Sequence, residues 1–362
     1  MTRVRSLASA HLVIAVVIMG GLAPTQAPSY AGASAPRTTE RGVRHVHVPT
    51  QARAVDTSHP DHVVGNGAPA SCTSKKVVDA VAEGGVITFD CGPDPVVITM
   101  RRTAKVFNRH GDQNVRRVVI DGGGLVTLSG NGRRRILYQN TCDPNQVWTT
   151  DHCDDQARPR LVVQHLTFAR GNSTGNHYDG GGGGAIFARG GRLRIVDARF
   201  VGNRCDRTGP DLGGAAVRAL SQYHGRSVYV VHSTFLGGRC SNGSGLSSIG
   251  VSWTVLNSVF RDNRATGHGA NPQPPGSPGG GSGGAIYTDG NDYTVRVGGT
   301  LMRHNHANEG GGAIFYVSND RSGRLHIHWS TLIDNVSERF ETRPGIFYLG
   351  RGPIEVRHSI IR

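Results

Sequence analysis

The feature that most constrains the fold of this 362-residue chain is a strand-like pattern that returns seven times. Each copy ends on a large apolar residue, and the residues seven and five places earlier are apolar as well. Alternation of this kind is typical of a strand with one buried face. The terminal residues are Phe168, Phe200, Phe235, Phe260, Met302, Leu332 and Ile361, and the preceding pairs are Leu161/Val163, Leu193/Ile195, Val228/Val230, Trp253/Val255, Val295/Val297, Leu325/Ile327 and Ile354/Val356.

The spacing of the copies predicts a solenoid. Successive copies lie 25 to 42 residues apart, and a glycine block also recurs, as GGAIF at 183–187, GGAAV at 213–217, GGAIY at 283–287 and GGAIF at 311–315. Such repeats bury their apolar faces by stacking on one another. Helical repeats are excluded by the lack of long helical patterns, and propellers by the lack of Trp-Asp signatures. We therefore predict an all-β fold, a single right-handed parallel β-helix over residues 69–362.

Asparagines recur at one position of the repeat. Asn203, Asn263, Asn305 and Asn335 each follow the terminal apolar residue by three places, whereas Asn172 follows by four and Gly238 replaces asparagine in one copy. In a β-helix these side chains would stack about 4.8 Å apart and hydrogen-bond along the axis. Asparagine also tolerates the left-handed backbone conformation, so we expect it to occupy the left-handed position of the turn.

The first 33 residues resemble a secretory leader. Arg3 and Arg5 precede an apolar run that ends in small residues, and we expect cleavage after Ala31 or Ala33. No second long apolar run follows, so no transmembrane segment is expected after cleavage. These observations predict a secreted, extracellular protein of unknown oligomeric state.

Export makes disulfides the expected state of the six cysteines. Cys205 and Cys240 each follow a terminal phenylalanine by five places, so a β-helix would stack them within bonding distance. Cys72 with Cys91 and Cys142 with Cys153 remain as pairs local in sequence. Metal binding by cysteine is the weaker alternative, because no Cys-x2-Cys pair occurs.

The segments around the repeats have distinct compositions. Residues 34–68 lack periodicity and are predicted to be a flexible spacer. Residues 73–83 predict a short helix with Thr73 or Ser74 as N-cap and Gly84-Gly85 as its end, which would cap the first coil. No capping segment is visible after Ile361, so we expect an exposed final strand or a separate partner. Insertions at 139–158 and 266–282 are where binding sites are usually built on solenoids.

These repeats resemble known families. The GGAI and Phe-x-x-Asn blocks resemble the repeat of chlamydial polymorphic outer membrane proteins. The stretches VITFDCGPDPVVIT and IDGGGLVTLSG resemble secreted right-handed β-helix proteins of the pectate-lyase-like superfamily. The resemblance covers about residues 70–362 and implies the fold. It implies no single function, because the superfamily includes lyases, hydrolases, esterases and adhesins.

Two stretches resemble enzyme motifs only in part. VWTTDHCDD at 147–155 is similar to the Trp-Ile-Asp-His motif of pectate lyases but has an extra residue between Trp148 and Asp151. GHG at 267–269 is similar to a polygalacturonase motif but lacks its paired aspartates and its Arg-Ile-Lys. If the protein is a lyase, Asp151, Asp154 and Asp155 are weak candidate Ca²⁺ ligands. The alternative is a solvated acidic loop, and no other cofactor is expected.

The outward positions of the repeated strand predict a ligand surface. The formal charge is +14, and almost all of the positive charge is arginine, which binds carboxylates and sulfates through two parallel hydrogen bonds. Val196, Val231 and Leu256 would form an apolar stripe, which we expect residues 34–68 or 266–282 to cover. The predicted binding residues are Arg194, Tyr229, Arg296, Arg324, His326 and His328, and the two histidines would bind more strongly below about pH 6.5.

The sequence leaves two function classes open. One is an adhesin-like β-helix that binds an acidic polysaccharide or cell-surface glycan without catalysis. The other is a polysaccharide lyase or glycoside hydrolase that acts on a uronic-acid polymer, so the catalytic residues are unknown. Nucleic-acid binding is not expected, because basic residues are not interleaved with aromatic residues.

Overall fold

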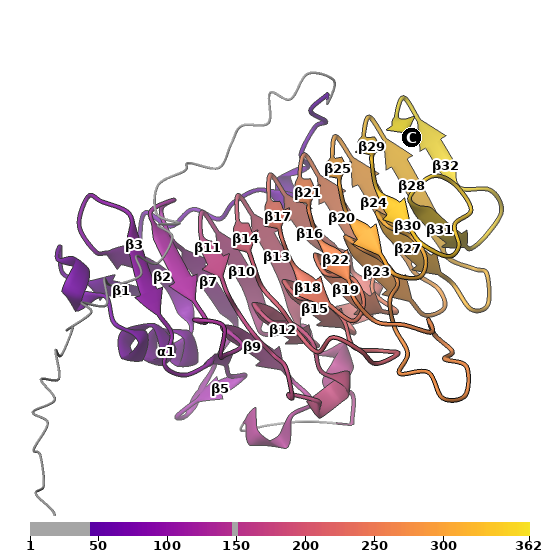
Figure 1. The fold of residues 1–362 in the computed structure, drawn as a ribbon. Coiled ribbons are helices and arrows are strands. Elements are labelled where there is room, and N and C mark those ends of the chain that lie inside the picture. The colour runs from indigo at the N-terminus through magenta and orange to yellow at the C-terminus, as the bar shows by residue number, and fades with distance from the viewer. Residues whose placement is uncertain (1–43, 147–150) are drawn as a thin grey trace, which may run out of the picture. The chain divides into compact units, whose positions relative to one another are not determined.

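The computed structural model describes residues 44–146 and 151–362, and this part of the chain forms a parallel β-helix (Figure 1). Each coil contributes one strand to each of three long parallel sheets, A, B and C. Some coils add a strand to a narrow fourth sheet between B and C. The coil is right-handed, the sense that parallel crossovers adopt. The predicted fold is therefore confirmed.

The strands are short. Sheet A contains β1 (His62–Gly65), β2 (Gly85–Asp90), β7 (Arg117–Asp121), β10 (Arg160–Gln164), β13 (Arg192–Val196), β16 (Val228–Val231), β20 (Trp253–Leu256), β24 (Thr294–Gly298), β28 (Arg324–His328) and β32 (Glu355–Arg357). Sheet B contains β3 (Val96–Thr99), β8 (Val126–Ser129), β11 (Thr167–Ala169), β14 (Arg199–Val201), β17 (Thr234–Leu236), β21 (Val259–Arg261), β25 (Leu301–Arg303), β29 (Thr331–Ile333) and β33 (Ile360–Ile361).

The third long sheet and the narrow sheet complete each coil. Sheet C contains β4 (Ala104–Val106), β9 (Leu137–Asn140), β12 (Ile186–Arg189), β15 (Val217–Leu220), β19 (Leu246–Ile249), β23 (Ile286–Asp289), β27 (Ile314–Val317) and β31 (Ile346–Leu349). The narrow sheet contains β18 (Arg239–Cys240), β22 (Arg264–Ala265), β26 (His306–Ala307) and β30 (Val336–Ser337). A hairpin of β5 (Arg109–His110) and β6 (Gln113–Asn114) projects from an early coil.

The predicted repeat register is confirmed. The terminal apolar residues pair from Phe168 through Ile361 along sheet B, and the apolar pairs before them align along sheet A. Phe168, Phe200, Phe235 and Phe260 stack face to face, with ring centroids 4.5 to 5.1 Å apart. We call these four residues the phenylalanine ladder. They are buried, so the ladder forms part of the core.

One glycine block is shifted by a residue from the predicted alignment. Ile186 pairs with Val217, so GGAAV at 213–217 lies one place out of step with GGAIF at 183–187. The structural equivalents are Gly183 and Gly214, both with positive φ. A Cβ on Gly214 would lie 2.3 Å from the carbonyl oxygen of Val217, so the turn requires glycine there. The glycine that forms the turn therefore determines how the strands pair, and the alignment of similar residues in the sequence does not.

The asparagine ladder is confirmed, and its predicted backbone conformation is wrong. Asn263 Nδ2 donates to Asn305 Oδ1 at 2.9 Å, and Asn305 Nδ2 donates to Asn335 Oδ1 at 2.9 Å. The left-handed residue is the one before each asparagine, for example Asp262 with φ 57° and Asp334 with φ 55°. The asparagines serve as hydrogen-bonding rungs, and the preceding residue makes the turn.

A helix and a disulfide cover the first coil, as predicted. Helix α1 (Ser74–Glu83) begins at Thr73, whose side chain accepts a hydrogen bond from the Lys76 amide, and ends at Gly84. Its apolar face packs onto the core of the coil. The three disulfides pair Cys72 with Cys91, Cys142 with Cys153 and Cys205 with Cys240, the last across successive coils.

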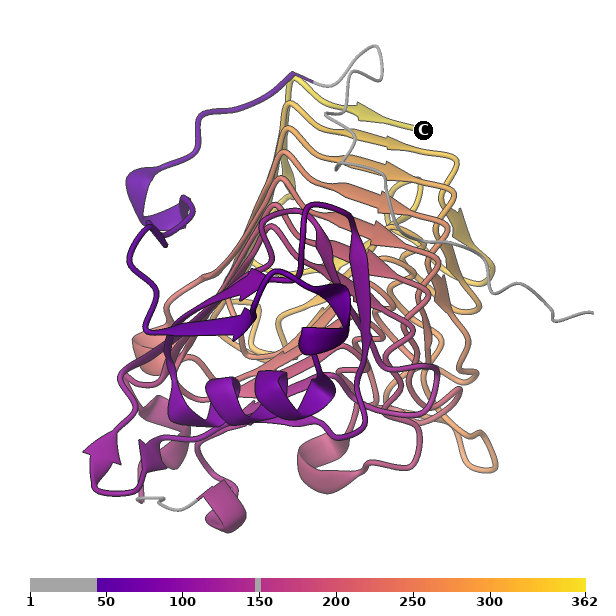
Figure 2. The same cartoon turned by 90° about the vertical axis from the view of Figure 1, so that its left-hand side faces the viewer.

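Residues 44–57, here called the strap, lie against the outer face of sheet A (Figure 2). The predicted apolar stripe of Val196, Val231 and Leu256 is buried beneath strap residues Val46, Val48 and Ala52. The flexible spacer predicted for 34–68 is therefore wrong for residues 44–68, because this part packs on the stripe and adds strand β1. Residues 34–43 and the predicted leader lie outside the described residues.

Two side-chain amides hold the strap in place. Asn257 accepts a hydrogen bond from the Val46 amide at 2.8 Å and donates to the Val46 carbonyl at 2.9 Å. Gln164 makes the same pair of bonds to Val55, at 2.8 and 2.9 Å. Each side-chain amide thus hydrogen-bonds both the backbone N–H and the backbone C=O of one strap residue, as a neighbouring strand would.

Candidate anion-binding surfaces

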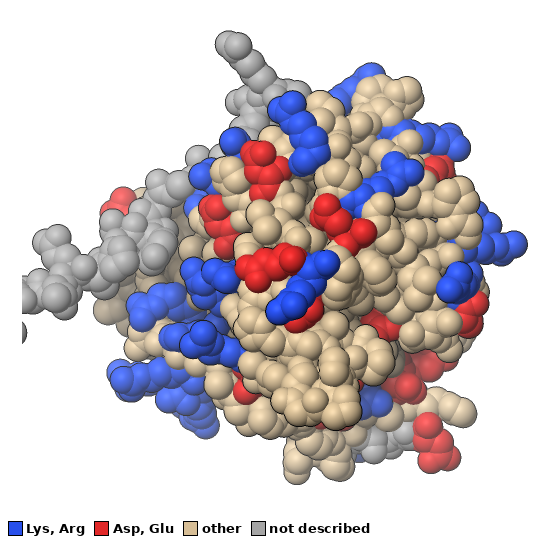
Figure 3. Space-filling view, turned by 45° about the vertical axis from the view of Figure 1, so that its right-hand side comes forward, with Lys and Arg blue, Asp and Glu red and all other residues tan. Residues whose placement is uncertain are grey.

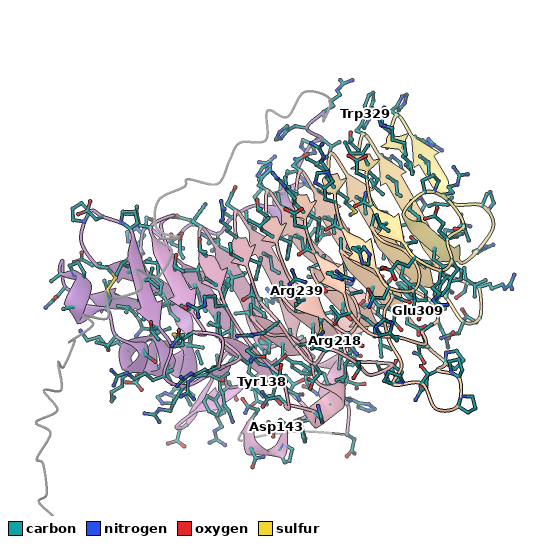
Figure 4. All side chains as sticks on the ribbon, in the orientation of Figure 1. Tyr138, Asp143, Arg218, Arg239, Glu309 and Trp329 are labelled. Atoms are coloured by element: carbon teal, nitrogen blue, oxygen red, sulfur yellow. A yellow bond between two sulfur atoms is a disulfide. The ribbon has the colours of Figure 1, made fainter. Side chains whose placement is uncertain are left out.

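The narrow sheet carries a column of basic side chains. Arg204, Arg239 and Arg264 align on successive coils, and His306 follows Arg264 on the next strand. The three arginines are exposed, and Figure 4 labels Arg239, the middle one. We call Arg204, Arg239 and Arg264 the arginine ladder. Neighbouring strands are about 4.8 Å apart, so three positive charges follow one another along the axis.

The positive charges of the arginine ladder are not neutralised by nearby carboxylates among the described residues. Within residues 44–146 and 151–362, no carboxylate lies within 4.0 Å of these three guanidinium groups. Arg204 Nη2 donates to the Gly132 carbonyl at 3.2 Å, and Arg264 Nη2 donates to Asn308 Oδ1 at 3.3 Å. Like charges directly opposite each other on adjacent strands are destabilising. The protein keeps three such charges in one column with neutral partners only.

This ladder was not among the predicted binding residues, although the sequence contains a signal for it. Each arginine lies four places after a terminal phenylalanine, directly after Asn203, Gly238 or Asn263. The frame that locates the core strands locates these residues too. The outward positions considered from the sequence belong to sheet A, whereas these arginines lie along the narrow sheet.

A second arginine column lies at the first position of the sheet A strands, and it is better compensated. Arg117, Arg160 and Arg192 pair in register. Arg117 lies 3.8 Å from Asp61, and the Arg192 guanidinium lies 5.5 Å above the Tyr223 ring. Burial, followed by the neighbouring positive charges, lowers the pKa of Arg192. One of these charges is Arg160, the in-register neighbour of Arg192.

Two residues of the predicted binding strip contact the strap. Arg194 donates from Nη1 to the carbonyl oxygens of Gln51 and Arg53, at 2.9 and 2.8 Å. Tyr229 packs against the strap, and its hydroxyl accepts a hydrogen bond of 3.5 Å from Gln51. The register places these two residues in one row with Arg296 and His326, but the strap occupies their side chains.

The remaining strip residues lie toward the C-terminal coils. Arg296 on β24 is exposed and pairs in register with His326 on β28. Arg324, also exposed, lines a cleft of about 390 Å³ together with His326, Arg351 and Glu355. This end of the molecule shows basic and acidic side chains interspersed (Figure 3). The remaining strip residues, Arg296, Arg324, His326 and His328, therefore lie on a surface that carries both basic and acidic side chains.

Glu355 is the acidic partner in this region. Its Oε2 lies 2.6 Å from His326 Nδ1, and its Oε1 lies 2.7 Å from Arg357 Nε and 3.8 Å from His328 Nε2. Burial lowers the pKa of His328, so its protonation requires a lower pH than that of an ordinary histidine. The strap thus covers one end of the predicted strip, and Glu355 pairs with His326 and Arg357 at the other end. Arg296 and Arg324 have no carboxylate within 4.0 Å among the described residues.

The corner between sheets A and B carries a column in which charges alternate. Asp121, His165, Asp197 and His232 follow one another, with nitrogen–oxygen distances of 3.0, 3.8 and 3.7 Å. Burial raises the pKa of Asp121, but hydrogen bonds outweigh this effect and hold the pKa well below its usual range. The donors are His165, Gln164, the Gly123 amide and Thr57 of the strap. We call the four residues Asp121, His165, Asp197 and His232 the Asp–His column.

Two of the candidate enzyme residues, Asp155 and His268, have ordinary hydrogen-bond partners in the described part of the chain. Asp155 accepts a hydrogen bond from the His224 amide at 2.6 Å and so anchors a neighbouring turn. Asp151, Asp154 and Asp155 do not belong to a described group of three converging metal ligands. His268 lies 3.2 Å from the Asn308 amide nitrogen, and Trp148 lies outside the described residues.

Comparison with known proteins supports the repeat assignment. Residues 257–289 match the family model of the Chlamydia polymorphic membrane protein repeat. This stretch runs from the corner residue Asn257 through Phe260, Asn263 and the insertion to the GGAIY block. It therefore contains the sheet B, narrow-sheet and sheet C strands of one coil. No curated protein and no solved structure matches the chain. No helix among the described residues is long and apolar enough to cross a membrane.

Proposed function

We propose that this protein is an extracellular, adhesin-like β-helix that binds an acidic glycan through the arginine ladder. The observation that carries the proposal is the column of Arg204, Arg239 and Arg264, which repeats one charge on successive coils with no carboxylate within 4.0 Å among the described residues. An anionic ligand would supply the missing negative charge.

The form of the ladder suits a linear polymer. A chain that lies along the solenoid axis meets one guanidinium group per coil, at intervals of about 4.8 Å. Guanidinium groups bind carboxylates and sulfates with two parallel hydrogen bonds, which gives each contact a defined orientation. The favoured ligand is therefore a carboxylated or sulfated polysaccharide rather than an isolated small anion.

Three observations favour the cell exterior as the place of action. The repeat matched at 257–289 is named for a membrane protein family, and the first 33 residues have the composition of a secretory leader. The three disulfides are also typical of an oxidising compartment.

A glycan fits this surface better than a nucleic acid does. Proteins that bind single-stranded nucleic acids combine positive charge with exposed aromatic rings on which bases stack. Tyr178 is the only large aromatic side chain that is prominently exposed in the described ranges, and it lies on the loop before β12. Shape and charge, without stacking, point to an anionic polysaccharide.

The test is binding to immobilised heparin and polygalacturonate by the purified protein without residues 1–33. Replacement of Arg239 and Arg264 together by glutamine removes two charge-assisted contacts. Such contacts contribute about 1.5–3 kcal/mol each, so we expect affinity to fall at least about a hundredfold. Binding should also weaken as salt rises, because exposed charges are screened.

A matched variant controls for net charge. Arg101→Gln/Arg102→Gln removes two exposed arginines from an early coil and should retain binding. Arg296→Gln/Arg324→Gln separates the ladder from the strip on sheet A, and loss of binding in that variant alone would move the site to sheet A. Equal loss in all three variants, or equal binding of duplex DNA, would replace the proposal by a general attraction to polyanions.

A further inference from the structure

Three metal-ligating side chains meet on the outer face of sheet A. His326 and His328 lie two places apart on β28, so their side chains share one face of the strand. Glu355 on β32 pairs in register with His326. One ligand atom from each of the three residues lies within 4.8 Å of the other two. The set consists of two imidazoles and one carboxylate.

The distances within this group suit a bound ion. Glu355 lies 2.6 Å from His326 Nδ1 through one oxygen and 3.8 Å from His328 Nε2 through the other. Zinc–nitrogen and zinc–oxygen bonds of about 2.0–2.2 Å in a tetrahedron place ligand atoms roughly 3.3 Å apart. The observed distances lie on both sides of this value, so small side-chain rotations would open the required space.

We propose that His326, His328 and Glu355 form a binding site for a divalent transition metal, with Zn²⁺ as the best match. Two histidines and a carboxylate are a ligand set that proteins use for zinc where one coordination position stays open. The side chains are partly buried, at 17%, 39% and 32% exposure respectively, so the site is held by its surroundings and remains accessible. The proposal is independent of glycan binding by the arginine ladder.

The open coordination position would face the neighbouring cleft. His326 and Glu355 line this cleft of about 390 Å³, and Arg324 and Arg351 line it as well. A fourth ligand that enters there therefore meets two cations beside the metal. An anionic oxygen ligand, such as a carboxylate, satisfies the metal and the arginines together.

Arg357 competes with the metal. Its Nε lies 2.7 Å from Glu355 Oε1, so metal binding requires this ion pair to loosen. Replacement of Arg357 by glutamine should free the carboxylate and tighten binding. The variant adds no metal ligand, so tighter binding would indicate that the freed Glu355 carboxylate binds the metal. Adventitious binding to surface histidines does not involve Glu355.

The experiment is a titration of the full mature chain with Zn²⁺, followed by Co²⁺ substitution and visible spectroscopy. We expect one equivalent of metal to bind and the Co²⁺ spectrum to show the intense bands of four-coordinate geometry. His328→Ala should weaken Zn²⁺ binding at least about tenfold, and Arg357→Gln should strengthen it. Glu355→Gln provides a second ligand variant that preserves side-chain size.

His304→Ala is the matched control. His304 is 44% exposed and lies 3.6 Å from Asp334, so it resembles His328 in exposure and in its acidic neighbour. It should leave Zn²⁺ affinity unchanged. Equal weakening in His304→Ala and His328→Ala, or the absence of saturable binding by the unaltered chain, would overturn the proposal. Unfolding midpoints of all variants establish that each one is folded.

Discussion

The phenylalanine ladder inside the coil and the arginine ladder outside it share one geometry and have opposite energetics. Both place identical side chains on successive coils of the same solenoid. Inside, stacked rings exclude water and attract one another. Outside, guanidinium groups at the same spacing repel one another. Repetition alone therefore does not show that a column stabilises the fold.

The Asp–His column shows how this protein compensates charge when a column serves the fold. Acid and base alternate along Asp121, His165, Asp197 and His232, and the strap covers part of the column. A second alternation, Asp262, His304 and Asp334, lies at the next corner. Two outward columns are balanced internally, whereas the arginine ladder has no carboxylate within 4.0 Å among the described residues. Under the proposed function, an anionic ligand supplies that balance.

The interior ladder should show the largest effect. Phe235 is fully buried, with ring centroids 4.7 Å from Phe200 and 4.5 Å from Phe260. Phe235→Ala removes both contacts and leaves a cavity, so we expect a loss of about 3–5 kcal/mol in the free energy of unfolding. Chemical denaturation measures the loss. Phe235→Leu keeps most of the volume and should cost less, and equal costs for the two variants would argue against a role for stacking.

The asparagine ladder should come next. Asn263 accepts from the Gly238 amide at 3.0 Å and donates to the Phe235 carbonyl at 3.0 Å and to Asn305. Asn263→Ala leaves three buried polar groups without this partner, and we expect a cost of about 2–3 kcal/mol. Asn335→Ala is a milder comparison, because Asn335 is only partly buried. A smaller effect at Asn263 than at Asn335 would contradict the ranking.

Much of the fold could be predicted from the sequence because buried positions repeat with a fixed period. The seven repeat copies and the Cys205–Cys240 disulfide follow from the repeat register, and the cap at Thr73 follows from a local rule. The strap could not be assigned a conformation, because residues 44–57 lack periodicity and are held by distant partners such as Gln164 and Asn257. The apolar stripe predicted that some segment covers it, but it did not indicate which segment does so.

The candidate surfaces were harder to predict than the fold. Outward residues obey no packing rule, so the sequence indicates which face they share but not what neutralises them. Arg194 and His326 occupied correct outward positions, yet the strap binds the first and Glu355 binds the second. The repeat pattern locates the arginine ladder, because each of its residues lies four places after a terminal phenylalanine. Its lack of acidic partners became visible only when the coils were stacked.

The Asp–His column should give an intermediate, pH-dependent effect. Asp121→Asn weakens the charged hydrogen bonds to His165 and to Thr57 of the strap, and we expect a loss of about 1–2 kcal/mol near pH 5. Denaturation and amide exchange at Val55, a strap residue, measure the loss and its location. Asp197→Asn is the comparison variant, because Asp197 lies farther from its two histidines.

The pH dependence follows from two opposite pKa shifts. The lowered pKa of Asp121 gives stability that is present above about pH 4 and is lost as pH falls toward the folded pKa. The hydrogen bond to Asp121 raises the pKa of His165, which gives stability that is present below about pH 6.5 and is lost as pH rises through the folded pKa. The difference between the unaltered chain and Asp121→Asn should therefore peak between these limits. A difference that is constant from pH 3 to pH 8 would contradict this account.

The arginine ladder should show the smallest effect on stability, with the opposite sign. Arg239 lies between Arg204 and Arg264 and has no carboxylate within 4.0 Å in the described part of the protein. Arg239→Gln relieves repulsion on both sides, so we expect a gain of at most about 0.5 kcal/mol at low salt. The gain should vanish in concentrated salt, where charges are screened within about 3 Å. Arg303→Gln is the control, since Arg303 lies 3.4 Å from Asp334 and should give no such gain.

The sign of this small effect decides what the ladder is for. If Arg239→Gln stabilises the free protein and also reduces the thermal stabilisation by bound heparin, the ladder is a binding surface that the fold tolerates at some cost. A destabilisation of more than about 1 kcal/mol would instead show that Arg239 supports the coil, as Phe235 does, and would remove the main argument for a glycan ligand. Thermal unfolding at two salt concentrations, with and without the polymer, distinguishes these outcomes because ligand binding raises the midpoint only where the native state holds the ligand.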